Sequence, residues 1–232
     1  MALLILIFLG YALLTGNVAS PIATLLRQPA SAAAWTTFAA FAIAIGLGIT
    51  FHEFMHAYVA HRKGDDTGRT LGRMSLDPRA HLDPFGSLLI VLLGFGYGRP
   101  VPVNEARLRS GRWGLALVSV AGPLTNVALA AVAALPLRAN AAGALGDAYA
   151  QILTAIVVYN VLLAVFNLIP VPPLDGSKVV YALLPPQQAW TWRSYEQYGP
   201  FIFILLLLFG VLPLLVGGPA RALITVLLGP AF

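Results

Sequence analysis

Apolar runs of membrane-spanning length dominate this sequence. A transmembrane helix needs about 20 mostly apolar residues, and the chain offers six candidate runs, at 2–19, 34–60, 113–137, 147–169, 200–216 and 219–232. The first run lacks a basic leader and a cleavage site, so we interpret it as a span rather than a signal peptide. The last is short for a full crossing. The sequence therefore predicts an all-α polytopic membrane protein with about six transmembrane helices.

The composition excludes a water-soluble domain. Hydrophobic residues make up 59% of the 232-residue chain and charged residues only 10%, against about 25% charged residues in soluble domains. We attribute the net charge of +5 to basic loops between the spans, as is usual in membrane proteins, rather than to a nucleic-acid-binding surface. We therefore expect the lipid bilayer as a partner, and no nucleic acid. Because the chain has no cysteine, any metal must be held by histidines and carboxylates.

One apolar stretch is too short to cross a bilayer. Residues 85–95 form half a span and are followed by Gly96 and Gly98, a pattern that favours a re-entrant segment over a crossing helix. We predict such a segment near residues 85–104. Two interpretations stay open for it: a re-entrant plug, or a β-hairpin whose edge pairs with an unwound peptide.

The basic residues predict the orientation. Nine of the fourteen Lys and Arg residues lie between residues 62 and 112, and by the positive-inside rule this loop is cytoplasmic. Six spans would then place both termini in the cytoplasm. We predict a multi-pass cell-membrane protein whose functional site, described next, lies toward the cytoplasmic side.

An H-E-x-x-H motif occurs near the end of the second run, at residues 52–56. His52 and His56 are one helical turn apart on one face, so both imidazoles can reach one zinc ion. Glu53 lies beside the metal, where it can act as a general base. The composition gives a chance of below about one in a thousand for this motif. The alternative is a polar cluster near the headgroups, but ionisable residues inside a span favour a functional site.

A catalytic zinc site needs a third protein ligand and one open position. Five side chains are candidates. We interpret His61 as solvated and Glu105 as an ion-pair partner, whereas His81 and Asp83 lie in a polar loop where a turn role and a chemical role both stay open. The remaining candidate, Asp175, follows the fourth run among apolar residues and prolines. A carboxylate at membrane depth is costly unless a cation offsets it, so we favour Asp175 as the ligand. The alternative is that it caps a helix over residues 177–184.

Prolines and asparagines mark the rest of the expected site. Pro170, Pro172 and Pro173 cannot continue a helix, and irregular backbone at membrane depth occurs where it lines a cavity or is packed in protein. Three asparagines lie within apolar spans, and we expect interhelical hydrogen bonds from them. For two of the three we also predict contact with substrate: Asn126 and Asn167.

With these residues identified, the chain resembles the site-2 proteases, a family of zinc intramembrane metalloproteases, in their compact prokaryotic form without a PDZ module. The likeness covers about residues 40–185 and is carried by five segments, 52–56, 64–88, 99–104, 122–126 and 167–176. It implies one zinc ion per chain on His52, His56 and Asp175, with Glu53 as base. It also implies hydrolysis of a peptide bond in the transmembrane segment of a membrane-protein substrate, near the cytoplasmic face.

We therefore predict a single domain over residues 1–232, with a catalytic core at about 34–185, that works as a zinc-dependent intramembrane endopeptidase. The main alternative is a metal-ion transporter or channel that uses the same His and Asp cluster. Transport, however, gives no reason for Glu53 at its position in the motif. A second alternative, an adaptor without catalytic activity, is disfavoured by the intact motif.

Overall fold

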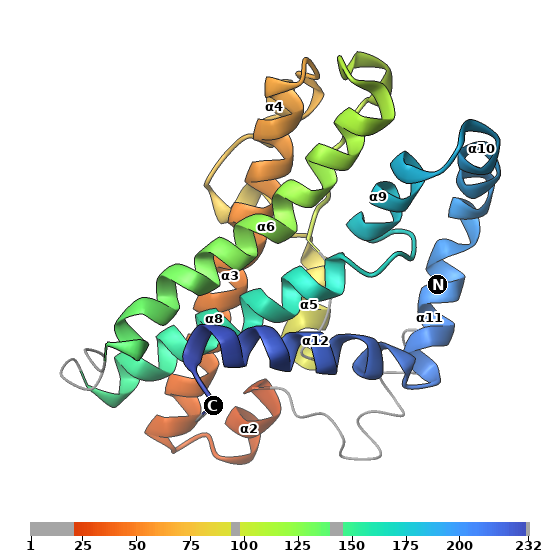
Figure 1. The fold of residues 1–232 in the computed structure, drawn as a ribbon. Coiled ribbons are helices and arrows are strands. Elements are labelled where there is room, and N and C mark those ends of the chain that lie inside the picture. Colours follow the sequence, from red (N-terminus) through yellow and green to blue (C-terminus); the bar gives the residue numbers. More distant parts are fainter. Residues whose placement is uncertain (1–20, 94–97, 140–145, 231–232) are drawn as a thin grey trace.

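The described part of the chain folds into helices joined by loops of varied length (Figure 1). The computed structural model describes residues 21–93, 98–139 and 146–230, and no strand occurs among them. The predicted first span, 2–19, lies outside the described residues. The helices are α2 (Pro21–Arg27), α3 (Ala32–Arg62), α4 (Thr67–Thr70), α5 (Pro84–Leu93), α6 (Gly111–Arg138), α8 (Asp147–Asn167), α9 (Asp175–Leu183), α10 (Pro186–Tyr195), α11 (Gly199–Leu208) and α12 (Val211–Leu228), with 3₁₀ turns η1 (Pro78–Ala80), η2 (Glu105–Arg107) and η3 (Glu196–Tyr198).

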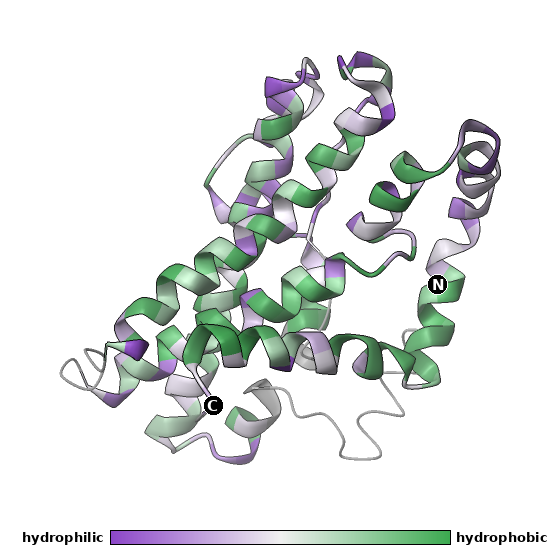
Figure 2. Ribbon diagram, in the orientation of Figure 1, coloured by the Kyte–Doolittle hydropathy of each residue, from purple (hydrophilic) through white to green (hydrophobic). Residues whose placement is uncertain are grey.

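Four of the described helices, α3, α6, α8 and α12, are long and apolar enough to cross a membrane. The first three coincide with the predicted spans at 34–60, 113–137 and 147–169. The prediction of an all-helical membrane protein is confirmed, whereas the described residues do not establish six crossings. Hydrophilic residues gather at the ends of α4, α6 and α10, and the middle of the bundle is apolar (Figure 2).

The two C-terminal runs are divided differently from the prediction. We expected one helix at 200–216, but the chain breaks at Gly210, whose φ of 67° is left-handed. This conformation suits glycine because it has no Cβ. α11 is therefore only 10 residues long, about 15 Å at 1.5 Å per residue. α12 has 18 residues and contains Pro219, where we had expected a boundary.

The predicted re-entrant region contains a short helix. α5 has 10 residues, too few to cross a hydrocarbon core of about 30 Å. Residues 98–104 follow in non-helical conformation and form no strand. The described residues on either side, 84–93 and 98–104, therefore do not support the β-hairpin interpretation. Residues 94–97 lie outside the described part of the chain.

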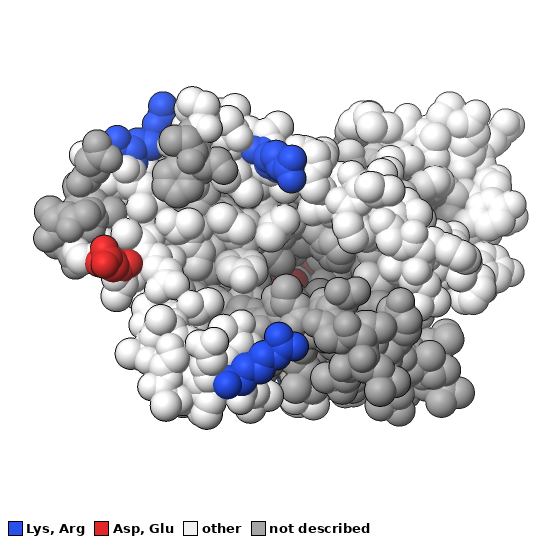
Figure 3. Space-filling view, turned by 90° about the horizontal axis from the view of Figure 1, so that it is seen from below, with Lys and Arg blue, Asp and Glu red and all other residues white. Residues whose placement is uncertain are grey.

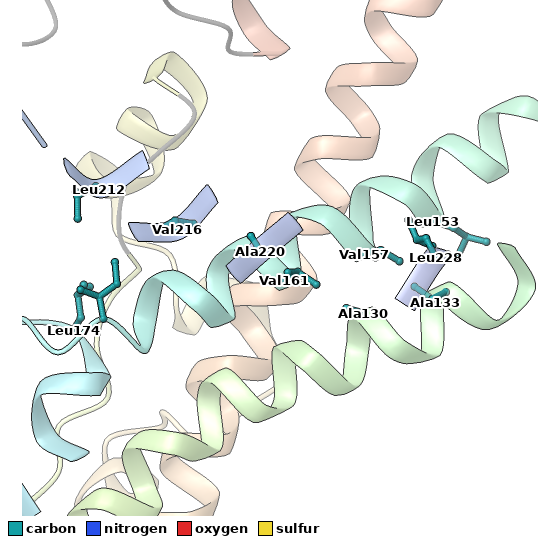
Figure 4. Close-up of a cluster of buried hydrophobic side chains, with 12 residues drawn as sticks. Ala130, Ala133, Leu153, Val157, Val161, Leu174, Leu212, Val216, Ala220 and Leu228 are labelled. Atoms are coloured by element: carbon teal, nitrogen blue, oxygen red, sulfur yellow. The ribbon is translucent and has the colours of Figure 1, made fainter. Parts of the chain in front are cut away.

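The core is built where α3, α6 and α8 pack side by side, with α12 lying along α8 (Figure 1). Small residues of α6, such as Ala130 and Ala133, face Val157 and Val161 of α8 and Ala220 of α12 (Figure 4). Small side chains allow helices to approach closely, which is how transmembrane helices gain van der Waals contact. This packing fixes the three long helices that hold the site.

Candidate metal centre

The two histidines of the motif lie on the buried face of α3. His52 and His56 are 6% and 7% exposed, and their Nε2 atoms are 2.9 Å apart. α3 continues without a break through this region, so the spacing of four residues places the two imidazoles on one face, as predicted. Both rings point toward the same position between α3, α6 and α9.

Asp175 completes this cluster. Its Oδ2 atom lies 3.2 Å from Nε2 of His52 and 3.0 Å from Nε2 of His56. The residue opens α9 after the irregular stretch 168–174, which confirms the break expected from the prolines. The helix-capping alternative is wrong, because the N-cap is Leu174 and no side-chain cap forms. A carboxylate in the first turn is also favoured by the helix dipole.

The hydrogen bonds of the two rings fit a metal site. Nδ1 of His56 donates to the carbonyl oxygen of Val118 at 2.7 Å, and Nδ1 of His52 lies 2.6 Å from Oδ1 of Asn126. With the protons on Nδ1, both Nε2 lone pairs are free to bind a metal. The two nitrogens and a carboxylate oxygen of Asp175 lie within 4.8 Å of one another. Three such ligands match a catalytic zinc site.

Gly122 of α6 keeps the metal position open. A Cβ atom on Gly122 would lie 2.6 Å from Nε2 of His52 and 2.6 Å from Nε2 of His56. Real Cβ contacts do not come this close, so only glycine leaves room in front of both ligand atoms. The donor set and this space together fit zinc.

Glu53 lies next to the histidines and lines the adjoining cavity. Its Oε2 atom accepts a hydrogen bond of 3.1 Å from the backbone N–H of Val101, in the segment 98–104. Glu53 does not belong to the group of possible metal ligands found among the described residues. This separation is what the motif predicts for a base rather than a ligand.

A second carboxylate holds the other end of the same segment. Asp65 is fully buried just after α3 and accepts hydrogen bonds from the backbone N–H of Asn104 at 2.7 Å and from Thr67. Burial alone would raise the pKa of Asp65, but the hydrogen bonds from Thr67 and Asn104 outweigh it and lower the pKa. Sequence reasoning did not single out Asp65.

Two of the other candidate ligands form ion pairs away from the centre. Nδ1 of His61 lies 2.5 Å from Oδ1 of Asp66 on an exposed surface. Glu105 pairs with Arg193 at 2.7 Å. Both positions agree with the predicted solvated or ion-paired roles.

The remaining two candidates have structural contacts. His81 is fully buried, and its Nε2 donates to the carbonyl oxygen of Ser75 at 2.7 Å. Asp83 accepts from the backbone N–H groups of Phe85 and Gly86 at the start of α5. Neither belongs to the metal cluster, so of the two roles left open for them, the structure is consistent with the turn role.

The asparagines occupy different environments. Asn126 is fully buried, contacts His52, and donates to Asn160 across the α6–α8 interface at 2.8 Å, which confirms the expected interhelical hydrogen bond. It is not among the residues that line the cavity. Asn167 does line the cavity, but it donates within its own helix, to the carbonyl oxygen of Leu163, rather than to another helix as expected. Substrate contact therefore stays a prediction that the position of Asn167 favours and that of Asn126 does not.

Several features of the site had no clear sequence signal. Lys178 is the exception, because it donates to Oδ1 of Asp175 at 3.1 Å and its spacing of three residues on α9 would have indicated this pairing. Gly122 lies in a segment that the family resemblance includes, but its contact with the histidines depends on the packing of α6 on α3. The carbonyl of Val118 carries no side-chain signal.

A cavity of about 1560 Å³ opens beside the centre, larger than the ~300–1,000 Å³ of common small-molecule sites. Glu53 and the three candidate ligands line it, and so do apolar side chains such as Phe203 and Leu207 of α11. Seen from below, the molecule shows few charged side chains and a central hollow, inside which part of an Asp or Glu residue is visible (Figure 3). The cavity therefore joins a polar centre to apolar walls.

Membrane-length helices around a buried cluster of two histidines and a carboxylate, with a glutamate in H-E-x-x-H spacing, define the class as a membrane-embedded metallopeptidase. The sequence model of peptidase family M50 matches residues 40–141 and 139–210. This chain belongs to peptidase family M50, and it is a zinc metallopeptidase.

Curated relatives agree with this assignment. "Putative zinc metalloprotease YwhC" of Bacillus subtilis is 39% identical over 170 residues, which cover 71% of this chain and 78% of that protein. "Putative zinc metalloprotease Rip2" of Mycobacterium tuberculosis is 34% identical over 182 residues, covering 74% of this chain and 66% of the relative. "Putative zinc metalloprotease MJ0611" of Methanocaldococcus jannaschii is 33% identical over 146 residues, 60% of this chain and 67% of the relative. No solved structure matches the chain.

Proposed function

We propose that this zinc metallopeptidase is an intramembrane endopeptidase that hydrolyses peptide bonds in transmembrane segments of membrane proteins. The observation that carries the proposal is the position of His52, Glu53 and His56 on a membrane-length helix, beside a cavity with apolar walls. Such a cavity favours an apolar peptide delivered from the bilayer. In this proposal, residues 1–232 form one domain that carries out the hydrolysis, and its catalytic core covers about residues 34–185.

In this proposal, His52, His56 and Asp175 hold one zinc ion. Zinc bound there supplies a Lewis acid that activates water and polarises the scissile carbonyl. Glu53 accepts a proton from the attacking water at its carboxylate and passes it to the nitrogen of the leaving amine. The C–O bond forms first, as water adds to the carbonyl carbon, and the peptide C–N bond breaks afterwards, when the protonated amine leaves and the carbonyl group re-forms. Lys178, bound to the second oxygen of Asp175, orients that carboxylate.

A helical substrate hides its carbonyl groups in internal hydrogen bonds, so it must unwind before attack. Residues 100–104 line the cavity in non-helical conformation, close to Glu53 through Val101. We propose that the unwound peptide lies along this segment and hydrogen-bonds to its backbone carbonyl groups. The N–H groups of Val101 and Asn104 are already bound to carboxylates, and Pro100 and Pro102 have none. Asn167, which also lines the cavity, is the side chain we propose for a further substrate contact.

The ligand set predicts which variants lose metal. Asp175→Ala removes one of three ligands and should lower zinc content per purified chain to near zero, together with cleavage of a membrane-embedded reporter peptide. The matched control is His81→Ala, another fully buried polar side chain, which should keep one zinc ion per chain. Zinc loss from His81→Ala with full zinc in Asp175→Ala would mean that the third ligand is misassigned.

We further propose that the loop between α3 and α6 faces the cytoplasm, because nine of fourteen basic residues lie at 62–112. Cysteines placed singly at Lys63 and Arg109 should react with a membrane-impermeant reagent only after the cells are opened. The backbone N–H of Arg109 donates to the carbonyl of Lys63 at 2.9 Å, so both positions must give the same answer. Labelling of both in intact cells would reverse the proposed orientation.

A further inference from the structure

Two asparagines form a buried bridge between the long helices beside His52. Asn126 of α6 and Asn160 of α8 are both fully buried. Placing two amides in an apolar helix bundle is unfavourable unless their hydrogen bonds are satisfied. Here each amide nitrogen has two acceptors, and the pair contacts α3 at three points: Ala44, Gly48 and His52.

Only one orientation of the two amide groups satisfies all of these hydrogen bonds. Nδ2 of Asn160 donates to the carbonyl oxygens of Ile156 at 2.9 Å and Ala44 at 3.4 Å. Carbonyl oxygens only accept, so the Asn160 nitrogen must face them and its Oδ1 must face Asn126. Nδ2 of Asn126 then donates to this Oδ1 at 2.8 Å and to the carbonyl oxygen of Gly48 at 3.0 Å. Turning either amide over would set oxygen against oxygen.

The oxygen of Asn126 is thereby fixed against His52. At 2.6 Å from Nδ1 of His52, it accepts the ring N–H, which leaves the Nε2 lone pair facing Asp175 and His56. We propose that Asn126, held in one orientation by Asn160, is a positioning residue that fixes the tautomer and the ring angle of His52 for zinc binding. This inference rests on the proposed function, in which His52 is a zinc ligand.

The two histidines differ in this respect. His56 is oriented by the backbone carbonyl of Val118, which side-chain substitutions leave in place. His52 depends on a side chain from another helix. The zinc affinity of the site should therefore respond to substitution of Asn126, even though this residue contacts neither metal nor cavity.

The experiment compares two substitutions of one residue. Asn126→Leu has similar size and removes the acceptor, so zinc affinity should fall by about 10–100-fold, the usual cost of losing such a partner. Asn126→Asp keeps an acceptor toward His52 but turns its second oxygen toward the Gly48 carbonyl. It should keep zinc affinity within a few-fold of wild type and unfold at lower temperature. Affinity is measured by competition with a chromogenic chelator on purified protein in detergent, and folding by helical circular dichroism.

Further variants keep the result interpretable. Thr50→Val removes another buried hydrogen bond of α3, to the carbonyl of Gly46, and should leave zinc affinity unchanged. Asn160→Leu frees the Asn126 amide without contacting His52 and should weaken zinc binding less than Asn126→Leu. The positioning role is wrong if Asn126→Leu folds and binds zinc as wild type does, or if Asn126→Leu and Asn126→Asp weaken zinc binding equally. If His52→Ala keeps full zinc affinity, the ligand assignment itself fails.

Discussion

The Gly122→Ala variant is expected to bind no zinc while keeping its helices. The added Cβ would lie 2.6 Å from the Nε2 atoms of both histidines, in the space that a metal needs. The rings cannot simply swing away, because their Nδ1 atoms are held by Asn126 and Val118. Alanine itself favours a helix by about 0.5–1 kcal/mol over glycine, so α6 should still form. Zinc per chain, measured by atomic spectrometry, should drop from one to near zero.

The matched control is Gly46→Ala on α3. A Cβ at Gly46 meets no atom within 4 Å, so the same chemical change should leave zinc content and cleavage unaltered. Full zinc occupancy in Gly122→Ala would show that the metal does not lie between His52 and His56 in front of α6, and the proposed centre would have to be moved.

The Glu53→Gln variant should give the opposite pattern, with one zinc ion per chain and almost no proteolysis. Glutamine keeps the size of the side chain and removes its ability to take a proton from water. General-base catalysis contributes about 10²–10⁴-fold in rate, so cleavage of a reporter peptide in liposomes should fall at least about 100-fold. Zinc content should stay at the wild-type level because Glu53 lies outside the ligand group.

This variant also separates the protease from a metal transporter. If the protein were a transporter, the Glu53→Gln variant would still carry metal across the membrane, and the wild-type protein would cut no peptide. Wild-type cleavage that stops on chelation and returns with zinc supports the protease, and cleavage by Glu53→Gln at the wild-type rate would remove the proposed mechanism. Since glutamine can still accept the hydrogen bond from Val101, the local backbone should be preserved.

The sequence predicts the site where the chemistry is local. His52, Glu53 and His56 lie within five residues on one helix, so helical periodicity alone brings the two imidazoles together. Asp175 is 123 residues from His52, and its assignment needed the cost of an unpaired carboxylate together with the family resemblance. The partners of the supporting residues could not be predicted. An interhelical hydrogen bond was expected from Asn160, but its contact with Asn126 and the closeness of Gly122 to the histidines depend on helix packing that periodicity does not encode.

The end of the chain shows the same limit. Residues 200–228 are almost continuously apolar, so hydropathy favoured breaks at the prolines. The helix instead breaks at Gly210 and continues through Pro219. Composition identifies an apolar region well, but the left-handed turn that divides α11 from α12 depends on a single backbone conformation.

The distance in sequence between the ligands has a thermodynamic consequence. With two ligands on α3 and one at the start of α9, zinc would bridge elements that the unfolded chain does not hold together. Metal that binds only the assembled bundle stabilises it by mass action, by about 4 kcal/mol when free zinc is 1,000 times the dissociation constant. Zinc supply would then govern how long α9 stays docked on the bundle, so that metal starvation would shorten the lifetime of the protein as well as stop its chemistry.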